Sequence, residues 1–173
     1  MAMSCRRQYK IFGKEFVLKG TSQIGKALGR VPSGLFVVTT KHEDSEDAVI
    51  ASWVSQCSFT PPAVSIVLAT VRPARLLIEA SSAFTVNILG VDSKDLMKHF
   101  FQASKDDLFK GIKTKKGFQG IRILSDAVAY LECALTESAH SGDHVMYIGE
   151  IVGGKMLQEG EPYIHVRSDG FSY

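Results

Sequence analysis

Short runs of β-branched and aromatic residues recur along the chain, and each run predicts a strand. The run at residues 63–71 is almost continuously apolar, which is typical of a strand buried on both faces. Residues 8–18 alternate more loosely and predict a short hairpin around Gly13 and Lys14. The other predicted strands cover residues 34–40, 48–52, 82–89, 129–137, 144–152 and 163–166.

Three segments show helical spacing instead. Thr21 is the expected N-cap of a helix that ends before Pro32, because the residue preceding a proline disfavours the α region. Pro73 suits the first turn of a second helix, and Asp92 or Ser93 would cap a third.

Two polar stretches separate these elements. We expect the acidic residues 43–47 to form an exposed loop and the basic residues 105–120 to run over the surface. The helices do not alternate regularly with the strands, which argues against a doubly wound parallel sheet. The pattern therefore predicts a mainly β fold, an antiparallel barrel with flanking helices.

Composition narrows the class of protein. The chain has 173 residues, 45% of them hydrophobic, and a net charge of +2, which fits an ordinary globular domain. That balance of charge predicts neither nucleic-acid binding nor attraction to a membrane surface. The apolar runs are too short to span a bilayer, and no apolar signal-peptide region follows Arg6 and Arg7.

The cysteines bear on metals and on the compartment. Cys5, Cys57 and Cys133 are widely spaced and form no CxxC motif, so no structural zinc or iron site is expected. His99 and His140 also lack partners at metal-ligand spacing. An odd number of scattered cysteines favours a reducing, cytoplasmic setting.

The segment ASWVSQCSF, residues 51–59, spaces the hydroxyls of Ser52, Ser55 and Ser58 three residues apart. As a loop between strands, it would leave backbone N–H groups free to approach a flat polar ring, such as the isoalloxazine ring of a flavin. The same spacing is also typical of a serine-bearing strand edge with local hydroxyl–backbone bonds.

Two further motifs could carry chemistry. Arg72 and Arg75 lie beside the start of the second predicted helix, where a helix N-terminus can bind a phosphate; solvated arginines are the alternative. Gly142, Asp143 and His144 precede the strand at residues 144–152. This histidine could face a cofactor at the barrel mouth, whereas Asp143 could simply form an Asx turn.

Motifs for other chemistries are absent from the sequence. It contains no GxGxxG, GxxxxGK[ST] or GxSxG pattern, which excludes the usual Rossmann, P-loop and hydrolase signatures. The basic run is expected to be a solvated loop or a docking surface for an acidic redox partner. Its lysines are Lys110, Lys113, Lys115 and Lys116.

Four blocks occur in a specific order: GRVPSGLFVVTT (29–40), ASWVSQCSFTPPAVSIVLA (51–69), FTVNIL (84–89) and GDHVMYIGEI (142–151). In this order they resemble the flavin-reductase-like family of FMN-binding split barrels. The phrases ASWVSQ, LMKHF (96–100) and DAVAYLEC (126–133) are similar to the flavin reductase module at the C-terminus of cyanobacterial-type flavodiiron proteins. The HxExD motif of a di-iron centre is absent here, so a stand-alone module without their oxygen-reducing activity is expected.

The resemblance implies an antiparallel split β-barrel domain over residues 21–173, preceded by an N-terminal extension over residues 1–20. It implies a homodimer with FMN near the subunit interface, FAD being an alternative, and NADH or NADPH as electron donor. The family's pattern also assigns roles to matched positions. Asp143 and His144 match its GDH motif, which is associated with nicotinamide binding and gives them as the catalytic candidates. Cofactor contacts are implied for Ser52, Trp53, Val54, Ser55 and Ser58 at the flavin ring and ribityl chain, Arg72 and Arg75 at the phosphate, and Asn87 near the cofactor-bearing strand.

The predicted function is that of an NAD(P)H-dependent flavin reductase, in which a hydride moves from nicotinamide C4 to flavin N5. One alternative is an FMN electron-transfer module reduced by a partner protein, with little direct NAD(P)H activity. Another is a non-catalytic flavin-binding scaffold, because a fold alone does not select among these functions. Cys57 stands where the family commonly has alanine, and the resemblance assigns it no role.

Overall fold

The computed structural model describes residues 8–11, 14–17, 20–104 and 107–171. Its contacts divide the chain into two compact units. The larger unit is Ser33–His165, and the smaller one takes in the described residues before and after it. All the candidate site residues lie in the larger unit. The predicted boundary between residues 20 and 21 stays a prediction.

The smaller unit contains a hairpin and a helix. Strand β1 (Gln8–Ile11) pairs antiparallel with β2 (Lys14–Val17), as predicted, although the turn residues 12–13 lie outside the described residues. Helix α1 (Thr21–Gly29) ends before Pro32, but its N-cap is Gly20 and not Thr21. Gly20 has a φ of 69°, a left-handed conformation that glycine adopts at low cost, and this shifts the cap by one residue.

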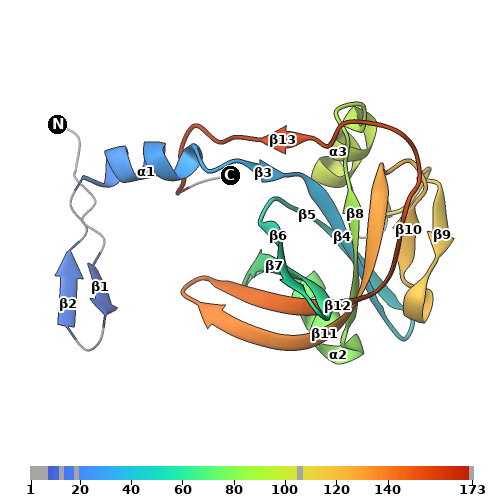
Figure 1. The fold of residues 1–173 in the computed structure, drawn as a ribbon, viewed down its shortest axis with the longest axis horizontal. Coiled ribbons are helices and arrows are strands. Elements are labelled where there is room, and N and C mark those ends of the chain that lie inside the picture. The colour runs from blue at the N-terminus through green and yellow to red at the C-terminus, as the bar shows by residue number, and fades with distance from the viewer. Residues whose placement is uncertain (1–7, 12–13, 18–19, 105–106, 172–173) are drawn as a thin grey trace. The chain divides into compact units, whose positions relative to one another are not determined.

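A seven-stranded antiparallel sheet forms the body of the larger unit, in the order β5-β4-β8-β11-β12-β7-β6 (Figure 1). This confirms the predicted mainly β class with flanking helices. Its strands are β4 (Phe36–His42), β5 (Ser45–Ala51), β6 (Val54–Phe59), β7 (Pro62–Ala69), β8 (Ala83–Ile88), β11 (Ala129–Ser141) and β12 (His144–Met156). Two short pairs accompany it: β3 (Ser33–Gly34) with β13 (Ile164–His165), and β9 (Thr114–Lys116) with β10 (Arg122–Leu124).

The sheet is covered on both faces. Val38 of β4 packs into a cluster with Ile78 of helix α2 (Ala74–Ser81), whereas its neighbour Val37 packs into a second cluster with Leu96 of helix α3 (Lys94–Gln102). Successive side chains of a strand point to opposite faces, which explains why adjacent valines enter different clusters. Figure 1 shows α2 and α3 at opposite ends of the larger unit.

One predicted loop is wrong, and one predicted surface segment has more regular structure than expected. Residues 43–47 do not form an open loop, because His42 pairs with Ser45 and only Glu43 and Asp44 turn the β4–β5 hairpin. The described part of residues 105–120 is not a plain surface excursion either. It contains β9 and a 3₁₀ turn at Phe118–Gly120, whose first backbone N–H donates to the Glu132 carboxylate at 2.6 Å.

The hydroxyl-rich segment adopts one of the two conformations that its spacing left open. Residues 54–59 form strand β6, which lies at the edge of the sheet and pairs with β7. Gln56 pairs with Val64 and Ser58 with Ala63, so Cys57 is the extra residue of a β-bulge. The alternative of a serine-bearing strand edge therefore describes this segment better than a loop.

Candidate functional site

The connection between β5 and β6 forms one side of the candidate site. Ser52 follows β5 directly, and its hydroxyl is one of two buried side-chain polar atoms with no hydrogen-bond partner in the described part of the chain. A buried hydroxyl without a partner costs free energy. A hydroxyl without a partner is available to form a hydrogen bond with a polar ligand.

Strand β6 continues this side of the site. Val54 packs partly buried against the core, Ser55 is exposed and Ser58 is half-buried. An edge strand presents backbone N–H and C=O groups that no neighbouring strand occupies. The backbone donors that the sequence suggested for a flat polar ring are therefore those of a strand edge.

The Gly142–Asp143 turn forms the opposite side. These two residues connect β11 to β12, with Ser141 paired to His144 across the turn. Gly142 has a φ of 63° and Asp143 has no positive φ, as in a type II′ turn with glycine at its first central position. The turn places Asp143 and His144 at the start of β12, as the sequence predicted for the GDH motif.

The two sides meet at an aromatic contact. The rings of Trp53 and His144 have centroids 4.7 Å apart and planes inclined by 40°. His144 Nδ1 lies 2.7 Å from Asp143 Oδ1, and the His144 side chain is 13% exposed while that of Asp143 is 92% exposed. The structure thus joins the ASWVS and GDH segments, with the imidazole held between a carboxylate and an indole.

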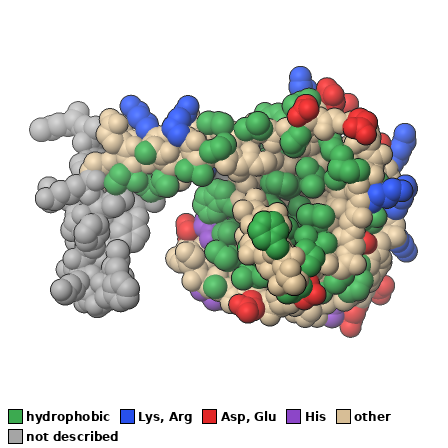
Figure 2. Space-filling model, in the orientation of Figure 1, with side chains coloured by type: hydrophobic (Ala, Val, Ile, Leu, Met, Phe, Trp, Pro, Cys, Tyr) green, Lys and Arg blue, Asp and Glu red, His purple; other side chains and the backbone are tan. Residues whose placement is uncertain are grey.

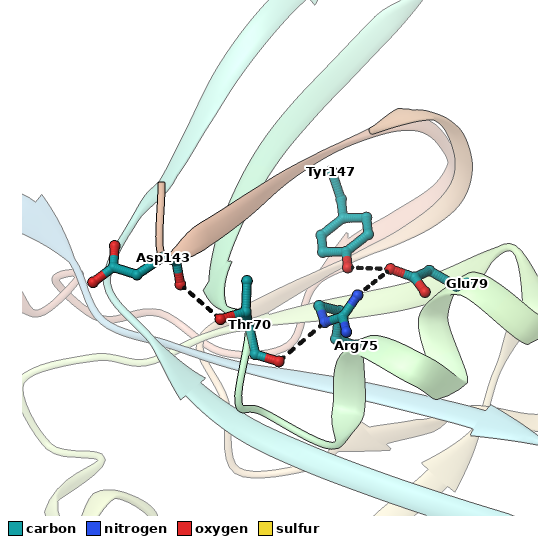
Figure 3. Close-up of polar contacts among 5 residues, drawn as sticks. All are labelled: Thr70, Arg75, Glu79, Asp143 and Tyr147. Atoms are coloured by element: carbon teal, nitrogen blue, oxygen red, sulfur yellow. Dashed lines mark hydrogen bonds and ion pairs between the residues drawn. The ribbon is translucent and has the colours of Figure 1, made fainter. Parts of the chain in front are cut away.

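The two arginines have different surroundings. Arg72 is exposed in the turn between β7 and α2, where a ligand phosphate could reach it and the start of the helix. The Arg75 side chain is instead 19% exposed, with Nε donating to the Thr70 carbonyl at 3.3 Å and Nη1 to Glu79 Oε1 at 2.8 Å (Figure 3).

Tyr147 completes this group. Its hydroxyl donates to Glu79 Oε1 at 2.6 Å, and its side chain is fully buried. Burial, followed by the bond to Glu79, raises the pKa of Tyr147 to about 12. The hydrogen bond with Tyr147 is the main cause that raises the pKa of Arg75 above its ordinary value, so the group holds a neutral phenol and a charged guanidinium.

Asn87 lies away from these residues' polar contacts. Its amide nitrogen donates to the Val37 carbonyl at 3.0 Å and to the Thr39 hydroxyl at 3.2 Å, and its amide oxygen accepts from Leu124 N at 2.8 Å. The side chain is completely buried. These bonds link β8 to β4 and β10, so we leave Asn87 out of the proposed site.

Sequence reasoning missed Thr70, Glu79 and Tyr147. The spacing of Arg75 and Glu79, four residues apart on a helix, could have suggested their ion pair. In the described part of the chain, no cluster of three or more His, Cys, Asp or Glu side chains is arranged to hold a metal ion. No helix described there has the length and apolar character needed to cross a membrane.

Comparison with known proteins identifies the family to which this chain belongs. Residues 28–172 match the flavin reductase like domain. The chain belongs to this family. It is 35% identical over 156 residues to diflavin flavoprotein A 1 of Synechocystis sp., a match that covers 88% of this chain and 27% of that protein. The chain thus spans about a quarter of the length of this curated relative.

Solved structures of the family share the fold. Nitrilotriacetate monooxygenase component B from Mycobacterium thermoresistibile superposes with a TM-score of 0.77 at 26% identity, covering 85% of this chain and 83% of that one. Streptomyces globisporus NADH:FAD oxidoreductase SgcE6, in complex with NAD and FAD fragments, gives 0.77 at 26% identity, covering 86% and 89%. Flavin reductase HpaC complexed with NADP+ gives 0.75 at 26% identity, covering 84% and 93%.

Proposed function

We propose that this chain is a flavin-binding oxidoreductase domain of the NAD(P)H-dependent flavin reductase type, with FMN as the flavin. The observation that carries the proposal is the contact of Trp53 with His144 beside the unpartnered hydroxyl of Ser52. It brings the two segments implied in flavin and nicotinamide binding to one place. Family membership and the nicotinamide- and flavin-bound relatives support it.

The residues of this site fit a flavin. Ser52 offers a buried hydroxyl in need of a partner, and the β6 edge offers backbone donors to a ring's polar rim. Trp53 and Val54 supply apolar surface, while Arg72 is exposed for a phosphate. When bound, a flavin would supply the hydride-accepting chemistry, and the protein supplies binding and orientation.

His144 and Asp143 orient the nicotinamide in this proposal. The Asp143 carboxylate holds Nδ1 of the imidazole at 2.7 Å, which fixes the direction of the ring. The tilted contact with the Trp53 ring restrains it from another side. A ring held in this way can position a second planar ring in reactive geometry, a contribution that depends on orientation and not on acid strength.

A homodimer is part of the proposal. Phe59, at the end of the edge strand β6, is 86% exposed, and Figure 2 shows hydrophobic side chains gathered over the middle of the larger unit, where β6 and β7 lie in Figure 1. Exposed apolar side chains on this face suit packing against a second copy. Light scattering of the purified protein at the mass of two chains would support this, and a monomer would contradict it.

A reducing, cytoplasmic setting also stays part of the proposal. Cys57 and Cys133 are free thiols in the structure, which is consistent with the prediction from the cysteine pattern.

The second candidate is an electron-transfer module reduced by a protein partner. The observation that favours it is the match to a diflavin flavoprotein of which this chain covers 27%, because a module within a larger redox protein can receive electrons from elsewhere. Anaerobic mixing of the FMN-loaded protein with NADPH and then with NADH separates the two. Rapid bleaching of the flavin band supports the reductase, and bleaching by a chemical reductant alone supports the module. Failure to bind FMN overturns both.

A further inference from the structure

A closed ring of hydrogen bonds connects the start of strand β12 with helix α2. Thr70, directly after β7, donates twice to the Asp143 carbonyl, from its backbone nitrogen at 2.9 Å and from its hydroxyl at 3.2 Å. The Thr70 carbonyl in turn accepts from Arg75 Nε at 3.3 Å. Arg75 is therefore connected to the turn that carries His144 through a single intervening residue, Thr70 (Figure 3).

The other end of the ring is anchored in the core. Arg75 Nη1 reaches Glu79 Oε1 at 2.8 Å, and the same oxygen accepts from the Tyr147 hydroxyl at 2.6 Å. Tyr147 is fully buried and belongs to the main core cluster. Since Tyr147 and His144 lie on the same strand, the bonds leave β12, pass through helix α2 and return to β12 at the turn.

The ring limits how the turn can move. A two-residue hairpin turn at the exposed end of a long hairpin has few contacts of its own, and Asp143 and Gly142 are both exposed. Thr70 and Arg75 tie the turn to a helix whose inner face is buried. Preorganisation of this kind improves binding by lowering the ordering cost of the bound state.

We infer that Arg75 is a positioning residue for the nicotinamide side of the site, acting through Thr70 on Asp143 and His144, and is not a ligand of the flavin phosphate. This inference rests on the proposed function. Two of the nitrogens of Arg75 already serve Thr70 and Glu79. Arg72, exposed in the preceding turn, stays the arginine that can reach a phosphate.

The geometry requires arginine at this position. One planar guanidinium serves a carbonyl and a carboxylate in fixed directions, whereas a lysine ammonium is a single point charge on a flexible stem. Arg75→Lys keeps the charge and removes the two-way bond. Arg122 provides a matched control, because it also holds a glutamate, Glu46, through Nε at 2.7 Å and a threonine hydroxyl, Thr114, through Nη1 at 3.0 Å.

The test compares the wild type with Arg75→Lys, Thr70→Val and the control Arg122→Lys. Three quantities are measured: the KM for NAD(P)H against kcat, the Kd for FMN, and the emission of Trp53 in the FMN-free protein. Trp53 is the only tryptophan in the chain, so its emission reports the contact with His144. Thermal melting identifies any variant that does not fold, and Thr70→Val, which loses one hydroxyl bond, then carries the test.

The inference predicts a KM for NAD(P)H raised about tenfold in Arg75→Lys, the size expected when one charge-assisted bond is lost. It predicts a smaller rise in Thr70→Val, a changed Trp53 emission in both, and an unchanged Kd for FMN. Arg122→Lys should match the wild type in all three. A Kd for FMN that rises in Arg75→Lys while KM and Trp53 emission stay unchanged would overturn the inference and restore a phosphate role.

The outcomes also separate this inference from the proposed function. If the wild type shows no reduction by NAD(P)H, the proposed function fails and the nicotinamide role of Arg75 fails with it, and Trp53 emission then decides only whether Arg75 and Thr70 hold the turn in place. A changed emission in Arg75→Lys and Thr70→Val supports this holding role, and an unchanged emission overturns it. If the wild type is active and the variants match it in KM and emission, only the positioning role fails.

Discussion

At the residue scale, Ser52 combines deep burial with an unsatisfied hydroxyl. Protein interiors satisfy most buried polar groups, so an exception asks for an explanation such as a missing ligand. A bound flavin offers carbonyl and ring-nitrogen acceptors that could accept a hydrogen bond from this hydroxyl. Ser52 would then lower the free energy of unfolding of the flavin-free protein and raise that of the flavin-bound protein.

This gives Ser52→Ala an unusual expected profile. Without flavin, the variant should be as stable as the wild type or more stable by up to about 1 kcal/mol, because the unsatisfied hydroxyl is gone. Its Kd for FMN should rise about tenfold, as for the loss of one hydrogen bond. Denaturant unfolding and FMN titration measure the two quantities.

Ser93 is the matched control for this substitution. It is also buried, but its hydroxyl accepts from Gly90 N at 2.9 Å. Ser93→Ala should therefore lose about 1 kcal/mol of stability and keep the wild-type Kd for FMN. Equal destabilisation of both variants, with FMN binding unchanged, would mean that Ser52 has no ligand to serve.

At this scale the sequence identified residue types well and their partners poorly. The patterns selected Ser52 and His144, and the family resemblance added Trp53; the structure places Trp53, which follows Ser52, against His144. Asn87 shows the limit, because its three partners come from residues 37, 39 and 124. Such distant partners follow from the strand order β4-β8 and from β10, which no local spacing reveals.

At the element scale, the β11–β12 turn depends on a glycine. Gly142 has a φ of 63° and a Cβ there would meet no atom within 4 Å, so a side chain is opposed by backbone strain alone. Gly111 has the same properties, with a φ of 75° and open space around it. The two glycines differ chiefly in what they carry: only Gly142 directly precedes Asp143 and His144.

Gly142→Ala and Gly111→Ala should each lose about 1 kcal/mol of stability, the usual cost of forcing alanine into a left-handed conformation. Only Gly142→Ala should raise the half-saturating concentration of NAD(P)H, by about threefold to tenfold, because the turn relaxes and moves His144. Chemical denaturation and steady-state kinetics check the pair. A change in NAD(P)H affinity of equal size in both variants would show that this turn has no special role in binding NAD(P)H.

Element types were predictable along most of the chain, while for the segment at residues 54–59 the spacing left a loop and a serine-bearing strand edge open. Its serines can bond to their own backbone and so favour turns and loops locally, yet the segment pairs with β7, and Cys57 is accommodated there as the extra residue of a bulge. Tertiary pairing therefore overrides local preference there. The loop expected at residues 43–47 was wrong for the same reason, since β4 and β5 pair up to His42 and Ser45.

At the scale of the whole molecule, two buried titrating groups bear on stability. The pKa of Tyr147 is raised to about 12, first by burial and then by its bond to Glu79. Burial, with the nearby charge of Glu132, also raises the pKa of the Cys133 thiol to about 12. In both cases the folded protein holds a proton that the unfolded chain releases at lower pH.

The free energy of unfolding should consequently fall as the pH rises above about 9, the ordinary pKa of the Cys133 thiol, and more steeply above about 10, the ordinary pKa of tyrosine, because the unfolded chain then binds fewer protons. The Tyr147 contribution amounts to at most about 3 kcal/mol, fully present below pH 10 and lost by about pH 12. Tyr147→Phe should flatten this decline, leaving the part due to Cys133. Unfolding curves at several alkaline pH values measure it, and an unchanged slope would show that Tyr147 ionises equally in both states.

A comparison of two histidines tests whether the turn carrying Asp143 and His144 is the nicotinamide side of a flavin site. His144→Ala and His140→Ala are loaded with FMN and mixed anaerobically with NAD(P)H. His140 is exposed on the same hairpin and pairs with Val145. We expect His144→Ala to keep FMN but to need about tenfold more NAD(P)H for half-maximal reduction, and His140→Ala to match the wild type. Wild-type reduction by both variants would contradict this role of the turn.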